Sequence, residues 1–183
     1  MPKKPQIYLD HASTTYIDPR VMAAMLPYFS EKYGNPSSLH QKGIEAKIAV
    51  DTARETIAKI LNCKSREIIF CGSATEANNL AIFGTAKAYK HKGNHIITSK
   101  VEHSSVRVTF EPIEKEGFKV TFLDTEKHGI IEPQTLQQAI TKETTLISII
   151  YGNNEIGTIE PIAQLAEVCR KNNIVFHTDA AQC

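Results

Sequence analysis

Polar residues of chemically useful types stand directly after four of the apolar, strand-like runs in this sequence. They are Ser73 and Thr75, Glu102 and His103, the run 153–155, and Asp179 and Gln182. In an open parallel sheet, ligands bind beyond the carboxyl ends of the strands, so these side chains are expected to gather at one rim. Such a rim could hold one ligand with an anionic tail for a helix N-terminus, a flat ring for the His103 imidazole and a basic nitrogen for the Asp179 carboxylate.

The stretch from Glu67 to Gly84 supplies the helix N-terminus in this scheme. Ile68–Phe70 is a short β-prone run, and a Gly-Ser pair separates it from a helical pattern that begins with a capping box formed by Ser73 and Glu76. The first turn, which contains Thr75, has free N–H groups that favour an anion such as phosphate. An ordinary strand-to-helix turn without a ligand is the alternative. The apolar residues that recur on one face of the helix are Ala77, Leu80, Ala81 and Ala88.

Each candidate also has a plain structural explanation when it is taken alone. His103 could be a turn residue, Asn153 and Asn154 are common turn formers, and Asp179 could cap a following helix. Gln182 alone indicates nothing. Together the residues favour a single ligand, and pyridoxal phosphate has the required phosphate, ring and ring nitrogen. An acidic partner for the pyridinium nitrogen suits the electron-withdrawing chemistry of that cofactor.

The composition fits one globular domain and excludes several classes of partner. Of the 183 residues, 42% are hydrophobic and 22% are charged, which is typical of soluble proteins with a core. The net charge of +1 gives no electrostatic argument for nucleic acid or for an anionic membrane. No apolar run is long enough to span a bilayer. The basic start, residues 1–6, is followed by no apolar segment, which argues against a signal peptide.

The cysteines are widely spaced and include no C-x-x-C pair. They are Cys63, Cys71, Cys169 and Cys183. This spacing argues against a zinc site, so no metal is expected, and against a disulfide framework, and it fits a reducing cytoplasm. The first three are expected to be small buried hydrophobic residues.

The order of the expected elements is that of an α/β protein. A helix is expected from Asp18-Pro19 to about Tyr33, then a turn-rich loop at 34–38, then a long helix at 41–61. The inner face of that long helix is expected to hold Ile44, Ile48, Ala53, Ile57 and Ile60. Strands follow at 95–98, 118–123, 145–151 and 174–178, with helices at 104–116, from 132–133 to about 141, and from 160–161 onward. This alternation predicts a mostly parallel sheet flanked by helices, and no repeat or linker marks a domain boundary.

The last two of these segments carry further expectations. The run TLISIIY at 145–151 is apolar without alternation, which predicts burial on both faces of the sheet. The helix that follows Glu160-Pro161 is expected to turn a set of apolar residues inward. These are Ile162, Leu165, Ala166 and Cys169.

With the elements in place, the sequence resembles the class V aminotransferase family of pyridoxal-phosphate enzymes, fold type I, and within it the cysteine desulfurases. The matching motifs are YLDHASTT (8–15), GNPSSLH (34–40), GSATEANNLAI (72–82), HIITSKVEHSSV (95–106), NNEIGTIEPI (153–162) and HTDAAQ (177–182). They occur in order and at family-like spacing over nearly the whole chain. The resemblance implies that residues 1–183 form an N-terminal segment and part of the cofactor-binding large domain of that fold.

The resemblance also implies a role for particular positions. The residues that would contact pyridoxal 5'-phosphate are Ala74 and Thr75 at its phosphate, His103 stacked on the ring, Asp179 at the ring nitrogen, and Asn154 and Gln182 at the ring face and its 3′-oxygen. His103 could in addition carry a proton during catalysis.

The reaction implied by the resemblance is the removal of sulfur from L-cysteine. The products would be L-alanine and a persulfide on an enzyme cysteine, which then supplies iron–sulfur cluster assembly or tRNA thiolation through a sulfur-acceptor or scaffold protein. The resemblance implies a homodimer in the full-length form, with the phosphate site completed across the subunit interface.

Two essential parts of the family pattern are not found in this sequence. The Schiff-base lysine of the family follows the DAAQ segment in a Ser/His/Lys motif, whereas the last lysine here is Lys171, inside the preceding helix. None of the cysteines present matches the sulfur-accepting cysteine, which lies further along. We therefore expect a piece of a longer desulfurase, without the C-terminal part of the large domain and most of the small domain. Alone it should be inactive and should behave poorly, because its last strand exposes an unpaired edge.

Two other readings stay open at this point. One is a relative with selenocysteine lyase or cysteine-sulfinate activity, although the NNEIG and GNPSSLH motifs favour a desulfurase. The other is a non-catalytic chain that binds the cofactor or acts as a scaffold half-subunit.

Overall fold

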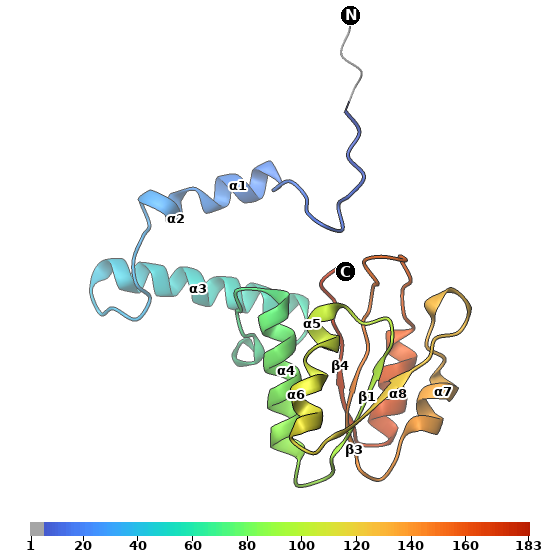
Figure 1. The fold of residues 1–183 in the computed structure, drawn as a ribbon. Coiled ribbons are helices and arrows are strands. Elements are labelled where there is room, and N and C mark those ends of the chain that lie inside the picture. Colours follow the sequence, from blue (N-terminus) through green and yellow to red (C-terminus); the bar gives the residue numbers. More distant parts are fainter. Residues whose placement is uncertain (1–5) are drawn as a thin grey trace, which may run out of the picture. The chain divides into compact units, whose positions relative to one another are not determined.

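The computed structural model describes residues 6–183, which form two compact units, 6–70 and Cys71–Cys183 (Figure 1). The sequence shows no linker at this division, and the expected organisation, an N-terminal segment with part of a large domain, stays a prediction. The basic start lies almost entirely outside the described residues. Each unit is described by itself below.

The first unit is made of helices that local sequence signals begin and end. They are α1 (Pro19–Met25), α2 (Pro27–Ser30), α3 (Gln41–Ile60) and the short 3-10 helix η1 (Ser65–Glu67). Asp18 caps α1 as predicted, because its Oδ1 accepts from the N–H of Arg20 at 2.8 Å. The single helix expected up to about Tyr33 was wrong: Pro27 has no N–H to continue the ladder, and α2 ends at Ser30.

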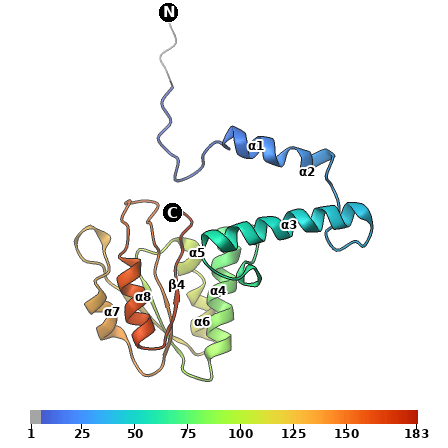
Figure 2. The ribbon, with the colours of Figure 1, turned by 180° about the vertical axis from the view of Figure 1, so that it is seen from behind.

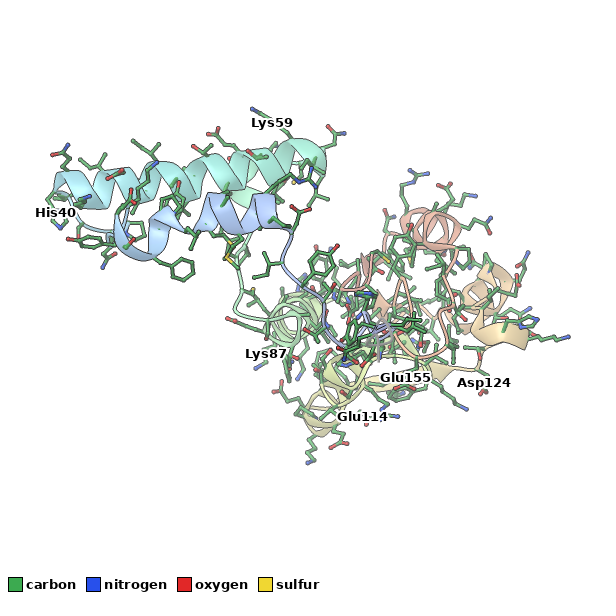
Figure 3. The ribbon with its side chains drawn as sticks, turned by 90° about the horizontal axis from the view of Figure 1, so that it is seen from above. His40, Lys59, Lys87, Glu114, Asp124 and Glu155 are labelled. Atoms are coloured by element: carbon green, nitrogen blue, oxygen red, sulfur yellow. The ribbon has the colours of Figure 1, made fainter. Side chains whose placement is uncertain are left out.

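Helix α3 has the predicted length but does not bury the predicted face. Figure 3 shows His40 and Lys59 at its two ends. The residues expected to face inward are exposed at Ile44, Ile48, Ala53 and Ile60 and half-buried at Ile57. The buried positions are the small residues Gly43, Ala46 and Ala58. Close packing explains this choice, since a Cβ added to Gly43 would lie 2.3 Å from the carbonyl oxygen of Ser38.

The second unit contains a parallel sheet, which confirms the predicted α/β fold class. Its strands are β1 (His95–Ser99), β2 (Lys119–Leu123), β3 (Thr144–Ser148) and β4 (Val175–His177). They lie in the order β2-β1-β3-β4, and all neighbours are parallel. Every residue of the inner strands β1 and β3 is buried, as the unbroken apolar run at 145–151 predicted. β4 is an edge of the sheet.

The strand predicted at Ile68–Phe70 does not form, which corrects the expected strand before α4. This segment is irregular, and Ile69 is 68% exposed. No strand among residues 6–183 pairs with it. Instead, the N–H of Ile68 donates to the carbonyl of Ser65 at 3.1 Å, and the carbonyl of Ile68 accepts from the guanidinium of Arg54. A strand needs a neighbour for its backbone groups. Here the groups of Ile68 have local partners, and Ile69 and Phe70 are exposed.

Helices cover both faces of the sheet, as Figures 1 and 2 show. They are α4 (Ala74–Tyr89), α5 (Ser104–Arg107), α6 (Phe110–Lys115), α7 (Pro133–Ala139) and α8 (Ile162–Lys171), with the 3-10 turn η2 (Lys127–Gly129). Two cores result. Ile96 and Leu146 pack with α4 to α6, whereas the adjacent residues Ile97 and Ile147 pack with α7 and α8. The alternation of side chains along a strand produces this division.

The helix predicted at 104–116 is broken into α5 and α6. Pro112 explains the break, because it cannot donate to the carbonyl of Val108 and its ring crowds that turn. Helix α4 starts at Ala74, as predicted, but buries a different face, namely Asn78, Ile82 and Ala86. On the face that the sequence suggested, Leu80 is 51% exposed, Ala77 and Ala88 are exposed, and Ala81 is half-buried.

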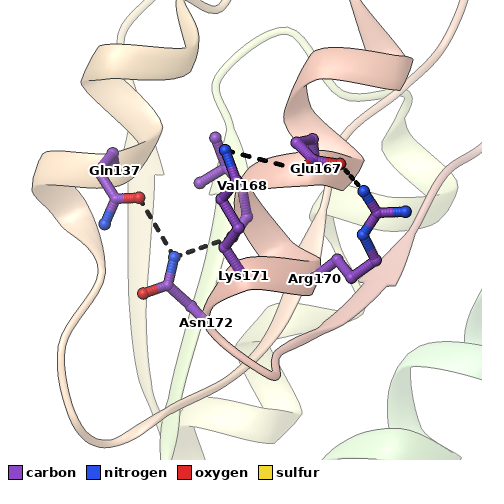
Figure 4. A network of polar contacts seen from close by, with 6 residues as sticks. All are labelled: Gln137, Glu167, Val168, Arg170, Lys171 and Asn172. Atoms are coloured by element: carbon purple, nitrogen blue, oxygen red, sulfur yellow. Dashed lines mark hydrogen bonds and ion pairs between the residues drawn. The ribbon is translucent and has the colours of Figure 1, made fainter.

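Helix α8 buries Leu165 and Cys169 as predicted, and its last turn is tied to α7 (Figure 4). Asn172 Nδ2 donates to Gln137 Oε1 at 3.2 Å and to the carbonyl of Val168 at 2.8 Å. Glu167 pairs with Arg170 and with Lys171. These exposed ion pairs contribute little, and the buried apolar contacts of α8 hold it on the sheet.

The cysteines differ from one another in burial. Burial raises the pKa of Cys169 to about 12, whereas Cys63 is exposed and Cys71 is half-buried, so the expectation of burial was wrong for Cys63. Among residues 6–183, no helix combines the length and the apolar character that crossing a membrane requires.

Candidate functional site

The predicted site residues lie where β1, β3 and β4 end and where α4 begins. Figures 1 and 2 show the start of α4, the start of α5 and the C-terminus at the same end of the sheet. Because parallel strands present their carboxyl ends at one edge, this is the edge where ligands of open α/β sheets bind.

The N-terminus of α4 is open to an anion. Ser73 Oγ accepts from the N–H of Glu76 at 3.1 Å, and the Glu76 carboxylate accepts from the N–H of Gly72 at 2.7 Å, one residue before the expected partner. Within residues 6–183, the N–H groups of Ala74 and Thr75 and the Thr75 hydroxyl have no hydrogen-bond partner. Both residues are exposed, so these donors can serve a phosphate.

A chain of buried hydrogen bonds connects α4, α5 and the end of β4. Asn78 Nδ2 donates to Asp179 Oδ2 at 2.8 Å and to Ser105 Oγ at 3.1 Å. Ser105 Oγ lies 2.8 Å from His103 Nδ1. The relative exposures of Asn78, Ser105 and Asp179 are 4%, 8% and 6%. The structure therefore links two of the predicted residues, His103 and Asp179, through two residues that the sequence did not single out.

Asp179 is a buried carboxylate without a cationic partner. Its Oδ1 accepts from the N–H of Ala181 at 3.0 Å, and its Oδ2 accepts from Asn78. No Lys, Arg or His in residues 6–183 forms an ion pair with it. Burying an uncompensated charge is unfavourable, so this position suits a ligand that brings a positive charge, such as a protonated ring nitrogen.

His103 has a structural and a chemical aspect. It is the N-cap of α5, and its Nδ1 accepts from the N–H of Ser105 at 3.1 Å. Because Nδ1 accepts hydrogen bonds, the neutral ring carries its hydrogen on Nε2. The side chain is exposed and lines a pocket of about 300 Å³ together with Glu102 and Asn154.

The two asparagines after β3 have different environments. Asn153 is a turn residue: its Oδ1 accepts from the N–H groups of Glu155 and Ile156, and its Nδ2 donates to the carbonyl of Val101 at 2.8 Å. It thereby fixes the loop that carries Asn154. Asn154 is half-buried, and its side chain makes no hydrogen bond within residues 6–183. It is available to a ligand in the pocket beside His103.

Gln182 and Thr75 are at the same edge but less closely joined to the others. Gln182 is exposed and packs near Gly152, where an added Cβ would lie 3.7 Å from Gln182 Cβ. Thr75 lines a second pocket of about 440 Å³ with Ser104 and Ser105. The structure therefore brings His103 and Asn154 into one pocket, joins His103 to Asp179, and places Thr75 beside Ser105.

Glu102 is a further buried acid at this edge. Its Oε1 accepts from Ser99 Oγ at 2.6 Å and from the N–H of Ile150 at 2.9 Å, while its Oε2 is buried and has no hydrogen-bond partner within residues 6–183. Burial raises the pKa of Glu102 to about 7. The sequence placed this residue after a strand but did not indicate its burial. For Asn78, the available signal was a polar residue in the i, i+4, i+8 stripe with Ile82 and Ala86.

The family model for aminotransferase class V matches residues 7–183 of this chain. The chain belongs to this family. Members of the class V aminotransferase family and their cysteine desulfurase relatives are enzymes that depend on pyridoxal phosphate. The open N-terminus of α4 and the uncompensated Asp179 carboxylate fit the phosphate and the ring nitrogen of that cofactor.

Relatives and solved structures narrow the similarity within the class V aminotransferases. Cysteine desulfurase IscS of Clostridium botulinum (strain Hall) is 50% identical over 177 residues, 97% of this chain and 45% of the relative. Cysteine desulfurase IscS of Rickettsia prowazekii is 50% identical over 96% of this chain and 43% of the relative. The chain thus spans less than half the length of these relatives.

Two solved structures have the same fold over almost the whole chain. A NifS-like protein has a TM-score of 0.93 and 35% identity, covering 98% of this chain and 50% of the NifS-like chain. SspA in complex with cysteine has a TM-score of 0.90 and 40% identity, covering 96% of this chain and 50% of SspA.

Proposed function

We propose that this chain is the cofactor-binding part of a cysteine desulfurase, which removes sulfur from L-cysteine and releases L-alanine. The observation that carries the proposal is the buried, uncompensated Asp179 carboxylate at the same sheet edge as the open N-terminus of α4. The similarity to IscS relatives and to SspA in complex with cysteine supports cysteine as the substrate. The proposed enzyme works in the cytoplasm, as a homodimer in its full-length form, with a sulfur-acceptor or scaffold protein as partner.

In this proposal the chain's own residues bind and orient the cofactor. The N–H groups of Ala74 and Thr75, with the Thr75 hydroxyl, donate to the phosphate. The remaining positions act on the ring: His103 stacks on it, Asp179 accepts from its nitrogen, and Asn154 and Gln182 contact its face and 3′-oxygen. When bound, pyridoxal phosphate supplies an electron-withdrawing ring next to the substrate's α-carbon.

His103 is the proposed proton carrier of the site. Its Nδ1 accepts from Ser105, so the exchangeable proton is at Nε2. The ring lines the pocket that also contains Asn154, and it can give and take a proton there.

The covalent steps need two further groups, a Schiff-base lysine and a sulfur-accepting cysteine. Lys171 lies in the last turn of α8 (Figure 4), just before β4 begins. It is therefore at the amino ends of the parallel strands, whereas the site lies at their carboxyl ends. It pairs with Glu167 at 3.5 Å. Cys183 is exposed beside Gly152. We propose that the Schiff-base lysine and the sulfur-accepting cysteine come from sequence outside these residues, as the parent domain organisation requires.

The binding role can be tested with pyridoxamine 5′-phosphate, which carries the phosphate and ring but forms no covalent bond with lysine. The 183-residue chain should bind this probe, measured by its fluorescence. Asp179→Asn should weaken binding by about tenfold to a hundredfold, because a hydrogen bond to a charged group is lost. Asp51→Asn, at an exposed acid of α3, is the matched control and should leave binding unchanged. No binding by the unaltered chain, or equal binding by Asp179→Asn, would overturn the proposal.

The prediction that this chain alone does not catalyse the reaction can be tested separately. The purified chain with added pyridoxal phosphate and L-cysteine should release no alanine. Lys100 lines the pocket of His103 and Asn154, but its Nζ donates to Asp124 Oδ1 at 2.6 Å, and the proposal takes the Schiff-base lysine from sequence outside these residues. Alanine release by this chain alone would show that a group among residues 1–183 performs the covalent step, against the proposal.

A further inference from the structure

The hydrogen-bond chain from Asp179 to His103 passes through Asn78, a residue to which the proposed function gives no role. We propose that Asn78 is a positioning residue that orients Asp179 toward the ring nitrogen and, through Ser105, orients His103. This inference rests on the proposed function and deepens it. It is carried by the juxtaposition of one buried amide with acceptors from two other elements.

The amide of Asn78 uses both of its hydrogens. Its Nδ2 lies 2.8 Å from Asp179 Oδ2, beyond the end of β4, and 3.1 Å from Ser105 Oγ, in α5. An amide nitrogen has two hydrogens and no capacity to accept, so both contacts are donations from Asn78. One planar group thus sets the spacing among α4, α5 and the segment after β4.

Asn78 is itself held in place by packing. It lies on the buried stripe of α4 with Ile82, which is 0% exposed, and Ala86, which is 1% exposed. A side chain whose helix face is fixed by a close-packed core has little freedom to rotate. Its hydrogen bonds are therefore directed rather than adaptable.

The neutrality of the asparagine matters for Asp179. One donor holds each carboxylate oxygen, Ala181 N at Oδ1 and Asn78 Nδ2 at Oδ2, which fixes the plane of the group and leaves further lone pairs open. A lysine or arginine in place of Asn78 would neutralise the carboxylate. The amide orients the charge and leaves it for a cationic ligand.

Ser105 connects the same hydrogen-bonded arrangement to His103. Because Ser105 Oγ accepts from Asn78, its own hydrogen is free to point at His103 Nδ1, 2.8 Å away. The N–H of Ser105 donates to the same Nδ1 at 3.1 Å. Both contacts keep hydrogen off Nδ1 and on Nε2, which is the nitrogen available to a ligand.

Asn79 offers a matched control at the next position of the same helix. It is half-buried, its Oδ1 accepts from Thr109 Oγ1 at 3.0 Å, and its Nδ2 donates to the carbonyl of Thr75 at 2.8 Å. It therefore also joins α4 to the segment between α5 and α6, but it has no hydrogen bond to Asp179 or His103. The same substitution at Asn79 perturbs α4 without removing a hydrogen bond among Asn78, Asp179, Ser105 and His103.

The first test measures how well the chain recognises the ring nitrogen. Two probes are compared, pyridoxamine 5′-phosphate and its 1-deaza analogue, in which a CH group replaces that nitrogen. The unaltered chain should favour the nitrogen probe by about tenfold or more, the value of a charged hydrogen bond. Asn78→Leu should reduce this preference to less than about threefold, because Asp179 loses a directing donor. Asn79→Leu should keep the full preference.

The outcomes separate this inference from the proposed function. If the unaltered chain binds neither probe or does not prefer the nitrogen probe, the proposed function fails. If it does prefer it and folded Asn78→Leu keeps the full preference, the positioning role of Asn78 is wrong. Circular dichroism checks folding, and Asn78→Ser, which is smaller and polar but too short to reach Asp179, replaces Asn78→Leu if the latter does not fold.

The second test needs no cofactor. In the spectrum of ¹⁵N-labelled histidine, His103 of the unaltered chain should carry its hydrogen on Nε2. Ser105→Ala should increase the share of the Nδ1–H form, because one of two donors to Nδ1 is removed, while Ser104→Ala, at an exposed neighbour without a side-chain hydrogen bond, should leave it unchanged. An Nδ1–H ring in the unaltered chain, or no response to Ser105→Ala, would contradict the extension to His103.

Discussion

The two units of this chain treat their apolar residues in opposite ways. In the second unit, Ile82, Ile97 and Ile147 are 0% exposed, and two cores cover both faces of the sheet. In the first unit, Leu39, Ile48 and Ile60 are 93%, 61% and 77% exposed. Among residues 6–70, the buried apolar side chains are those of Ala46 and Ala58.

This difference shows that local signals and burial are separate requirements. Asp18 and Pro19 begin α1 of the first unit where the sequence predicts, although α1 buries no side chain. In the second unit, the cap at Ser73 is joined to a packed helix face. An apolar stripe indicates that a helix face favours burial; it does not indicate that residues nearby in the sequence provide it.

The largest expected difference between the units comes from the same substitution, isoleucine to alanine, made once in each unit. Ile147→Ala should lower the free energy of unfolding by about 2–5 kcal/mol, because it leaves a cavity in a close-packed core. Ile48→Ala removes an exposed side chain from α3 and should change that free energy by less than about 0.5 kcal/mol. Urea unfolding followed by circular dichroism measures both.

A single result would erase the contrast. If Ile48→Ala costs as much as Ile147→Ala, then Ile48 is buried in solution. In that case the first unit has a core that the exposure of its side chains does not reveal.

The same contrast explains what the sequence could predict. The parallel fold was predictable because the apolar, β-branched run at 145–151 indicates a buried strand and the helices alternate with strands. The absence of a strand at Ile68–Phe70 was not predictable. Whether a strand forms depends on a neighbouring strand, which hydrophobic periodicity cannot detect. The prediction of the inner face of α3 was wrong for the same reason, because the packing partners of Gly43 and Ala46 decide which face is buried.

The units also differ in where they bury charge. Among residues 6–183, the buried carboxyl groups are those of Glu102, Glu160 and Asp179, all in the second unit. Burial raises the pKa of Glu102 from 4.5 to about 7. A carboxyl group whose pKa is higher in the folded state stabilises that state fully below its unfolded pKa, and this stabilisation is lost as the pH rises through the folded pKa.

The second prediction therefore concerns pH. Between pH 4.5 and about 7 the contribution of Glu102 to stability should fall by about 3 kcal/mol. Glu102→Gln cannot ionise, so the difference in unfolding free energy between it and the unaltered chain should change by that amount over this range. Urea unfolding at several pH values measures the difference.

Two points make this measurement specific to Glu102. The pKa values of His95 and His177 are lowered by burial, which makes stability fall as the pH drops, but both histidines are common to the two chains and cancel. Glu155→Gln, at an exposed position, serves as the control and should show no such change. A constant difference for Glu102→Gln would mean that this carboxyl titrates as it would in water.

The candidate site shows a further limit of sequence-based prediction. His103 and Asp179 were predicted from their places after strands, and their types suggested the chemistry. Asn78 and Ser105 join them in space, yet they lie inside helices, where a polar residue ordinarily faces solvent. The side on which Asn78 lies follows from the packing of Ile82, which only the fold defines.

The smallest expected effect compares the helix caps of the two units. Ser73→Ala removes the acceptor for the N–H of Glu76 and should lower the free energy of unfolding of the sheet-containing unit by about 1 kcal/mol, because α4 is packed in its core. Asp18→Ala removes the equivalent acceptor from α1, which has no buried residue. It should leave the urea midpoint of the sheet-containing unit unchanged and reduce the helical circular dichroism signal slightly. Equal shifts of the midpoint would show that α1 folds together with the sheet, and the separation of local helix formation from core packing would then be wrong for this chain.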